Sequence, residues 1–365
     1  MQTRMLSRQW VVMMWAGASL VGCAPEPRAE PQVATSEAAL RPARAPVLTP
    51  QVSGTTRTLI GLSAVDARVA WASGAGGTWA RTTDGGDTWQ IGVVPGAEAL
   101  QFRDVEAVSA DVAYLLSIGA GTDSRIYKTQ DGGATWTEQF RSASPDAFYD
   151  CFAFWSPTRA LAFSDAVAGR FPVIRTEDGQ TWQDIGDALP AAQPGEAGFA
   201  SSGTCVAVQG ANRAWIATGG AGKARILLTE DGGDTWEAVE TPVVQGTPSS
   251  GILSVAFRDA RHGMIGAGEL AAPEAFADTV ARTRDGGRTW SLASRPPFPG
   301  AIYGLAYARA ATAVVTGPAG AAWTVDEGDT WTALPGATGY WAVAFGTPHT
   351  GWLVGSAGRI LKIEL

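Results

Sequence analysis

The sequence predicts an all-β fold, a seven-bladed β-propeller, and two independent repeats carry this prediction. A string close to Thr-x-Asp-Gly-x-x-Thr-Trp occurs six times, from RTTDGGDTW at residues 81–89 to WTVDEGDTW at residues 323–331. The aspartates of successive copies lie 41 to 54 residues apart. A period of about 40–50 residues, with short apolar segments that end in glycine, is typical of propeller blades with four strands each.

A second repeat predicts the number of blades. A short apolar stretch precedes each string, and a seventh stretch follows the last string. When these stretches are aligned, one position is always alanine and the next residue is mostly large: Ala64, Ala107, Ala153, Ala207, Ala256, Ala306 and Ala344. Innermost strands crowd near a propeller axis, so a small side chain leaves room for a large one from the neighbouring blade. Seven stretches therefore predict seven blades.

The last repeat indicates how the ring closes. It begins near residue 339, and the chain ends before an outermost strand can form. We expect residues 45–52 to supply that strand, which removes two exposed sheet edges. The predicted propeller domain spans residues 51–365, with the closing strand taken from the segment before it.

The N-terminal segment has the features of a bacterial lipoprotein signal. Arg4 and Arg8 precede an apolar stretch that ends in Leu-Val-Gly-Cys at residues 20–23. A positive start, a short apolar centre and small residues before a cleavage point are typical of signal peptides. The ending resembles the bacterial lipobox, which implies lipidation of Cys23 and, with Ala24 next, location at the outer membrane. A plain secretory signal is the alternative.

The predicted signal peptide therefore spans residues 1–22. Residues 23–50 are rich in proline, alanine and charge. Such a segment cannot bury a core, so it predicts a tether between a lipid anchor and the propeller.

Each repeated string predicts a turn between the third and fourth strands of a blade. The aspartate can accept hydrogen bonds from the turn, glycine supplies positive φ, and the tryptophan buries surface in the blade core. The structural residues of the six strings are Asp84, Trp89, Asp131, Trp136, Asp178, Trp182, Asp231, Trp236, Asp285, Trp290, Asp326 and Trp331. The third string is one residue shorter, so we expect a distorted turn there, and the sixth has Glu327 where the others have glycine.

These strings resemble the Asp box, or BNR repeat, of sialidases, sortilin-like receptors and plant photosystem II stability/assembly factor-like proteins. The resemblance to the last group covers nearly all of residues 51–365. It implies an exported propeller that holds partner proteins. It does not imply a photosystem partner, because nothing in the sequence points to a photosynthetic host.

The candidate ligand site lies at the end of the ring opposite to the repeated turns. Three residues before each aligned alanine, the sequence places Gly61, Asp104, Asp150, Thr204, Leu253, Tyr303 and Trp341. Two acids, a hydroxyl and two aromatic side chains suit a small-ligand surface. Arg103, Arg125, Asp165 and Arg170 are candidate companions. A solvated funnel without a specific ligand is the alternative.

Composition excludes several function classes. The net charge of −8 argues against nucleic-acid binding. The two histidines, His262 and His349, fall on the side of the repeated turns, which argues against a Ser-His-Asp triad or a metal centre. We expect no cofactor. Cys151 and Cys205 occupy the same aligned position in adjacent blades, so we expect two buried free thiols.

The sequence favours a monomeric, membrane-anchored scaffold that binds a protein, a small ligand or a glycan at its funnel. A sialidase-like glycoside hydrolase is the first alternative, with Tyr303 as a nucleophile by position only. A propeller oxidoreductase is the second alternative.

Overall fold

The computed structural model describes residues 44–365. The predicted signal peptide, Cys23 and most of the predicted tether lie outside the described residues. Within residues 44–365, no helix has the length and apolar character needed to cross a membrane.

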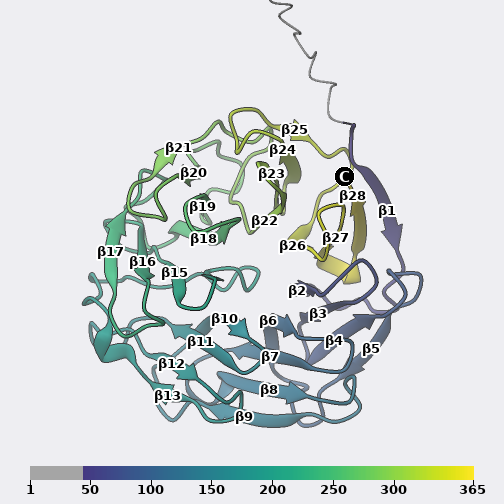
Figure 1. The fold of residues 1–365 in the computed structure, drawn as a ribbon, viewed down its shortest axis with the longest axis horizontal. Coiled ribbons are helices and arrows are strands. Elements are labelled where there is room, and N and C mark those ends of the chain that lie inside the picture. Colours follow the sequence, from purple (N-terminus) through teal and green to yellow (C-terminus); the bar gives the residue numbers. More distant parts are fainter. Residues whose placement is uncertain (1–43) are drawn as a thin grey trace, which may run out of the picture. The chain divides into compact units, whose positions relative to one another are not determined.

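Seven antiparallel sheets of four strands each form a ring, so the predicted seven-bladed propeller is confirmed (Figure 1). The innermost strands of blades 1 to 7 are β2 (Leu59–Ala64), β6 (Gln101–Ala107), β10 (Tyr149–Ser156), β14 (Val206–Gln209), β18 (Ser250–Phe257), β22 (Gly304–Arg309) and β26 (Tyr340–Phe345). The second strands are β3 (Ala70–Gly74), β7 (Ala113–Ile118), β11 (Arg159–Ser164), β15 (Arg213–Ala217), β19 (Gly263–Glu269), β23 (Thr312–Gly317) and β27 (Thr350–Gly355).

The outer half of each blade carries shorter strands. The third strands are β4 (Thr78–Thr82), β8 (Arg125–Thr129), β12 (Val173–Thr176), β16 (Arg225–Thr229), β20 (Val280–Thr283), β24 (Gly320–Thr324) and β28 (Ile360–Glu364). The outermost strands are β5 (Gln90–Val93), β9 (Thr137–Arg141), β13 (Gln183–Asp184), β17 (Glu237–Glu240), β21 (Ser291–Leu292), β25 (Thr332–Ala333) and, for blade 7, β1 (Val47–Gln51).

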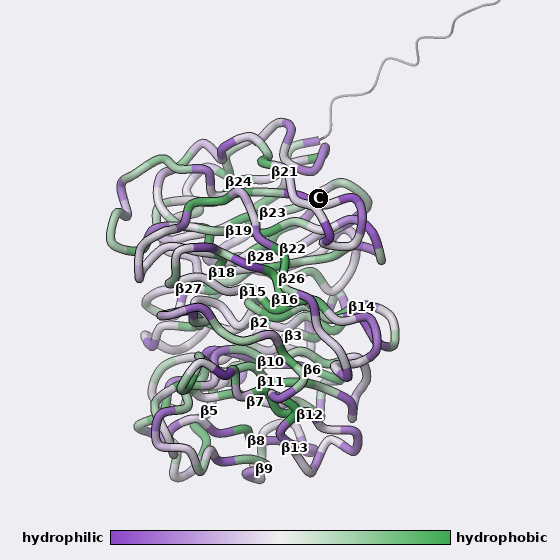
Figure 2. Tube along the Cα trace, turned by 90° about the vertical axis from the view of Figure 1, so that its left-hand side faces the viewer, coloured by the Kyte–Doolittle hydropathy of each residue, from purple (hydrophilic) through white to green (hydrophobic). Residues whose placement is uncertain are grey.

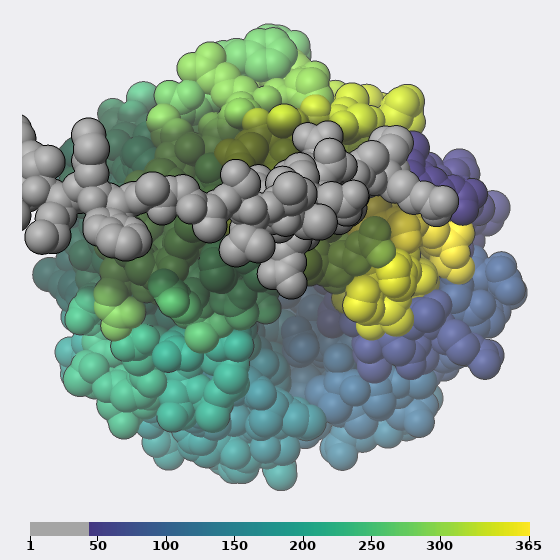
Figure 3. All heavy atoms as spheres, turned by 45° about the horizontal axis from the view of Figure 1, so that its top comes forward, coloured from purple at the N-terminus to yellow at the C-terminus, as the bar shows by residue number. Residues whose placement is uncertain are grey.

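Blade 7 is built from both ends of the described chain, as the sequence predicted. β1 pairs antiparallel with β28, with Val47 opposite Glu364. The first and last segments, purple and yellow in Figure 3, accordingly lie side by side. Gln51 then links blade 7 to blade 1, because its Oε1 accepts hydrogen bonds from Nε1 of Trp89 and of Trp352, both at 3.1 Å.

Side chains from adjacent blades interlock to form the core. Hydrophobic residues follow the strands, and hydrophilic residues gather in the connecting loops (Figure 2). The large residue after an aligned alanine packs on the preceding blade: Phe257 stacks on Trp215 at 3.5 Å and Phe154 contacts Tyr114 at 4.5 Å between ring centroids. These contacts bury aromatic surface between neighbouring blades, which stabilises the ring.

The prediction of two free thiols is wrong, because Cys151 and Cys205 form a disulfide with their Cα atoms 5.9 Å apart. The prediction assumed that both residues sit in equivalent strands and point the same way around the ring. Cys151 does lie in β10, but Cys205 lies in a bend just before β14 begins. The Cys205 N–H bonds to Cys151 Sγ at 3.2 Å, which holds this point of the chain against blade 3.

Candidate functional site

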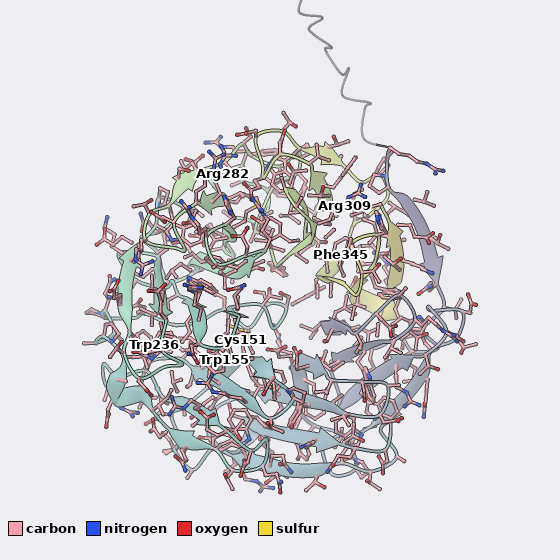
Figure 4. All side chains as sticks on the ribbon, viewed as in Figure 1. Cys151, Trp155, Trp236, Arg282, Arg309 and Phe345 are labelled. Atoms are coloured by element: carbon pink, nitrogen blue, oxygen red, sulfur yellow. A yellow bond between two sulfur atoms is a disulfide. The ribbon has the colours of Figure 1, made fainter. Side chains whose placement is uncertain are left out.

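The ring has two ends, which we call the turn end and the mouth. The turn end carries the six connections between third and fourth strands, where the repeated strings lie. The mouth carries the connections between second and third strands and the starts of the innermost strands. Figure 4 places Cys151 and Phe345 toward the ring axis and Trp236 toward the outer rim.

At the turn end, each aspartate of the repeated strings organises its own turn. Asp84 accepts hydrogen bonds from the backbone N–H of Thr88 at 3.0 Å, from the Thr88 hydroxyl at 2.6 Å and from the Thr82 hydroxyl at 2.8 Å. The same three bonds recur in the turns of Asp131, Asp231, Asp285 and Asp326. Hydrogen bonds to the ionised form lower the pKa of such a carboxyl, and they lower that of Asp84.

The shortened third turn keeps this bonding. Asp178 accepts from the backbone N–H and the hydroxyl of Thr181, both at 2.8 Å. The N–H of Gly179, the residue directly after the aspartate, bonds to the Thr176 hydroxyl at 2.9 Å. In the longer turns the residue two positions after the aspartate makes this bond. The expected distortion is therefore limited to the loss of one residue from the loop.

The sixth turn is stabilised by a contact between blades. Glu327 has φ of +56°, a conformation that usually favours glycine. Its carboxylate accepts a hydrogen bond from Arg258 Nε at 2.7 Å and from the Tyr307 hydroxyl at 3.3 Å. This ion pair between buried Glu327 and half-buried Arg258 of blade 5 explains why glutamate occupies the position.

The tryptophans of the strings differ in burial. Trp236 is 8% exposed, whereas Trp89, Trp136, Trp182, Trp290 and Trp331 are half-buried. Trp136 contacts Trp71 and Trp79 of blade 1 at 6.2 and 6.0 Å between ring centroids. The strings thus connect neighbouring blades as well as filling their own blade.

At the mouth, three of the predicted site residues form one cluster from three blades. Arg103 comes from β6, Trp341 from β26, and Tyr303 directly precedes β22. The Arg103 guanidinium lies 5.4 Å from the Trp341 ring centroid, and the Tyr303 and Trp341 rings meet edge to face at 5.0 Å. All three side chains are half-buried. We call them the mouth cluster.

The predicted acids lie beside this cluster but are covered. Asp104 and Asp150 are buried. Burial raises the pKa of Asp104, and burial followed by the charge of Asp165 raises that of Asp150. Burial also raises the pKa of Asp165. These three acids at the centre of the mouth therefore have raised pKa values, the opposite of the repeated aspartates at the turn end.

Arg125 and Arg170 do not join the cluster. Arg125 pairs with Glu138 of β9 at 3.6 Å. Arg170 pairs with Asp184 of β13 at 2.7 Å and with Asp187 at 2.5 Å. Both arginines thus contact the outer part of their own blade.

Sequence reasoning missed a segment that covers the acids: residues 198–203, which we call the mouth segment. Gly198 donates its N–H to Asp165 Oδ1 at 2.7 Å, and the Ala200 carbonyl accepts from Arg103 Nη1 at 2.8 Å. The Ser202 hydroxyl donates to the Tyr303 carbonyl at 2.5 Å. The loop before β14 accordingly reaches toward the axis (Figure 1). The long connection from β13 to β14 was the available signal, since long ordered loops are often functional.

Thr204 and Leu253 complete the ring below the segment. The Thr204 hydroxyl bonds to Ser202 and to Ser254, both at 2.7 Å, and Leu253 is buried. Beneath them lies a central cavity of about 360 Å³, lined by five of the aligned alanines and by Glu106. Glu106 is half-buried and has no hydrogen-bond or ion-pair partner within residues 44–365, and burial raises its pKa to about 7.

The fold and the mouth define a seven-bladed β-propeller in which a segment of the same chain covers part of the mouth. No family model and no curated protein sequence matches this chain. Solved structures do resemble it. A structure described as YCF48 bound to D1 peptide has a TM-score of 0.62 and 18% identity over 88% of this chain and 97% of that chain.

Two further structures share the fold. YCF48 from Cyanidioschyzon merolae has a TM-score of 0.61 and 17% identity, over 87% of this chain and 98% of that chain. The WD40 β-propeller domain of Doa1 has a TM-score of 0.54 and 14% identity, over 87% and 97%. Likeness at this level of identity shows the fold.

Proposed function

We propose that this chain is an exported, lipid-anchored β-propeller that holds a protein partner at its mouth. The observation that carries the proposal is the mouth cluster. Arginine, tyrosine and tryptophan are the residues enriched where protein interfaces concentrate their binding energy. Here the three lie in mutual contact, half-exposed, and come from blades 2, 6 and 7.

The covered acids favour binding over the glycoside hydrolase alternative. A sialidase-like enzyme with Tyr303 as its nucleophile would still need an accessible carboxyl group to act as general acid and base. Asp150 is buried, and the mouth segment donates a hydrogen bond to its neighbour Asp165. A propeller of the same fold whose description states that it is bound to a peptide, the D1-bound YCF48, lends further support to a protein ligand.

The anchoring part of the proposal rests on the N-terminal sequence. Residues 1–22 would be removed as a signal peptide, and lipidated Cys23 would hold the protein at the periplasmic side of the outer membrane. The tether leads directly into β1, the strand that closes the ring. We also assign the six repeated turns to the Asp-box class, on the basis of their sequence and recurring bonds.

Site-directed photocrosslinking tests the proposal. A photoreactive residue at Tyr303 should crosslink a defined protein in the native envelope. The matched control places the same group at Val325, which is 44% exposed at the turn end, and should give no such product. A partner that crosslinks from Val325 and not from Tyr303 would show that the binding surface is at the other end.

A further inference from the structure

The mouth holds its own segment partly through backbone groups that any peptide has. Asp165 accepts from the N–H of Gly198, and Arg103 donates to the carbonyl of Ala200. Ser202 adds a side-chain bond to the backbone of blade 6. The segment thus contacts the ring partly through its backbone, along a bent path in which the Ser201 N–H bonds to the Phe199 carbonyl at 2.7 Å.

The surroundings also select side chains along the segment. A Cβ at Gly198 would lie 2.8 Å from Oδ2 of Asp150, and one at Gly203 would collide with the Asp104 carboxyl. Gly203 also has φ of +76°, which favours glycine. A bulky residue at either position would have to displace a buried acid.

The position after the first glycine takes an aromatic ring. The Phe199 ring lies so close to the backbone of Gly219 and Gly251 that a Cβ on either glycine would come within 2.7 and 3.0 Å of it. The site therefore fits the pattern glycine, aromatic, two small residues, serine, glycine, which the chain itself supplies at residues 198–203.

The fit of this internal occupant is incomplete. Arg103 Nε is buried without a hydrogen-bond partner within residues 44–365, and Asp150 Oδ2 receives no donor from the segment and has only the Asp165 carboxyl beside it. Buried polar atoms usually have partners, and leaving one unpaired destabilises the folded state. Arg103 already contacts the segment at Ala200, so a peptide with an additional acceptor near that position could pair its free N–H.

We infer that the mouth is a peptide-binding site that the chain fills with residues 198–203, and that the partner inserts a bent segment of the same glycine–aromatic–small–small–serine–glycine type in their place. This inference rests on the proposed function, since it names the chemistry of the partner held there. The segment is fixed at both ends, by a bridge between Ala197 and Gly219 and by the disulfide of Cys205. Exchange therefore needs only its central residues to move.

The test uses a fluorescein-labelled peptide with the sequence of residues 197–204 and the oxidised propeller. Phe199→Gly combined with Ser202→Ala removes the ring and the hydroxyl that hold the internal segment. We expect this opened variant to bind the peptide at least tenfold more tightly than the wild type in fluorescence anisotropy. Phe276→Gly is the matched control, since Phe276 is 59% exposed in a loop of the same face; it should bind like the wild type.

Two further arms test the site and the pattern. Arg103→Ala in the opened variant should return the affinity to the wild-type level, and a peptide with valine at both glycine positions should bind at least tenfold more weakly. Equal binding by opened and wild-type proteins with normal melting curves would overturn the inference, and so would tight binding of the valine peptide. If the double variant does not fold, Ser202→Ala alone must show the same direction of change.

This outcome is separable from that of the proposed function. If a partner crosslinks from Tyr303 but the opened variant does not bind the peptide, the partner is held at the mouth by other chemistry. If the peptide binds but no partner crosslinks from Tyr303, the site exists and the proposed role of the mouth in partner capture is wrong.

Discussion

The turn end and the mouth use the same kind of side chain in opposite ways. At the turn end, Asp231 is exposed and hydrogen-bonded by its own turn, and its pKa is lowered to about 2. At the mouth, Asp150 is buried beside Asp165, and its pKa is raised. The repeated aspartates stabilise their own turns. Burial of Asp150 and Asp165 instead makes ionisation of these two carboxyls costly. Such a cost is typical of functional sites.

Loss of the disulfide should give the largest effect, and it acts at the mouth. The bond between Cys151 and Cys205 closes a loop with a sequence separation of 54. Loop-closure entropy then suggests that replacing both cysteines by serine lowers the free energy of unfolding by about 4 kcal/mol. Urea denaturation of the oxidised protein and of the double variant measures this difference. A loss below about 1 kcal/mol would mean that the bond does not constrain the unfolded chain.

Truncation of a buried tryptophan at the turn end should follow. Trp236→Ala removes a side chain that is 8% exposed, so we expect a loss of about 3 kcal/mol. Trp182→Ala is the matched variant in the third turn, where the ring is half-buried, and should lose about half as much. If thermal unfolding shows equal losses for the two variants, the burial of a tryptophan does not determine how much its turn contributes to stability.

The pH dependence of stability should have opposite signs at two acids. Glu106, in the cavity below the mouth, has a pKa raised from 4.5 to about 7, so its ionisation destabilises the fold as pH rises through that window. At pH 8, Glu106→Gln should then be more stable than the wild type by about 1 kcal/mol, a value reduced because solvent in the cavity screens the charge. Near pH 4 the two proteins should be equally stable.

Asp231 at the turn end should show the reverse. Its pKa falls from 3.8 to about 2, so its stabilisation is present above about pH 4 and is lost as the pH falls toward 2. Asp231→Asn should be about 1 kcal/mol less stable at pH 7 and should approach the wild type at pH 2. If the stabilities of the two variants relative to the wild type change in the same direction with pH, the proposed electrostatic difference between the mouth and the turn end is wrong.

The sequence predicted the parts of the molecule that repeat. The aligned alanines predicted seven blades, and the early end of the last repeat predicted the closing strand, because crowding at the axis and unpaired edges constrain every blade alike. The mouth segment does not repeat. Its path depends on contacts with Asp165, Arg103 and Tyr303 from blades 2, 3 and 6, and no local pattern encodes such contacts.

The error about the cysteines has the same origin. Alignment treated Cys205 as part of a regular strand, but the mouth segment turns the chain before β14 and brings its sulfur to Cys151. The ring positions of Asp104, Asp150, Tyr303 and Trp341 were foreseeable from the strand register. The strand register did not predict which of these residues the mouth segment covers.

The most direct measurement compares one half-buried tryptophan from each end, Trp341 at the mouth and Trp331 at the turn end. Each is changed to alanine, and both the melting temperature and the yield of the partner crosslinked in the native envelope are measured. We expect Trp341→Ala to reduce the crosslinked yield severalfold with little change in melting temperature, and Trp331→Ala to lower the melting temperature with the yield unchanged. The reverse result, with partner capture lost at Trp331 and kept at Trp341, would contradict the assignment of binding to the mouth.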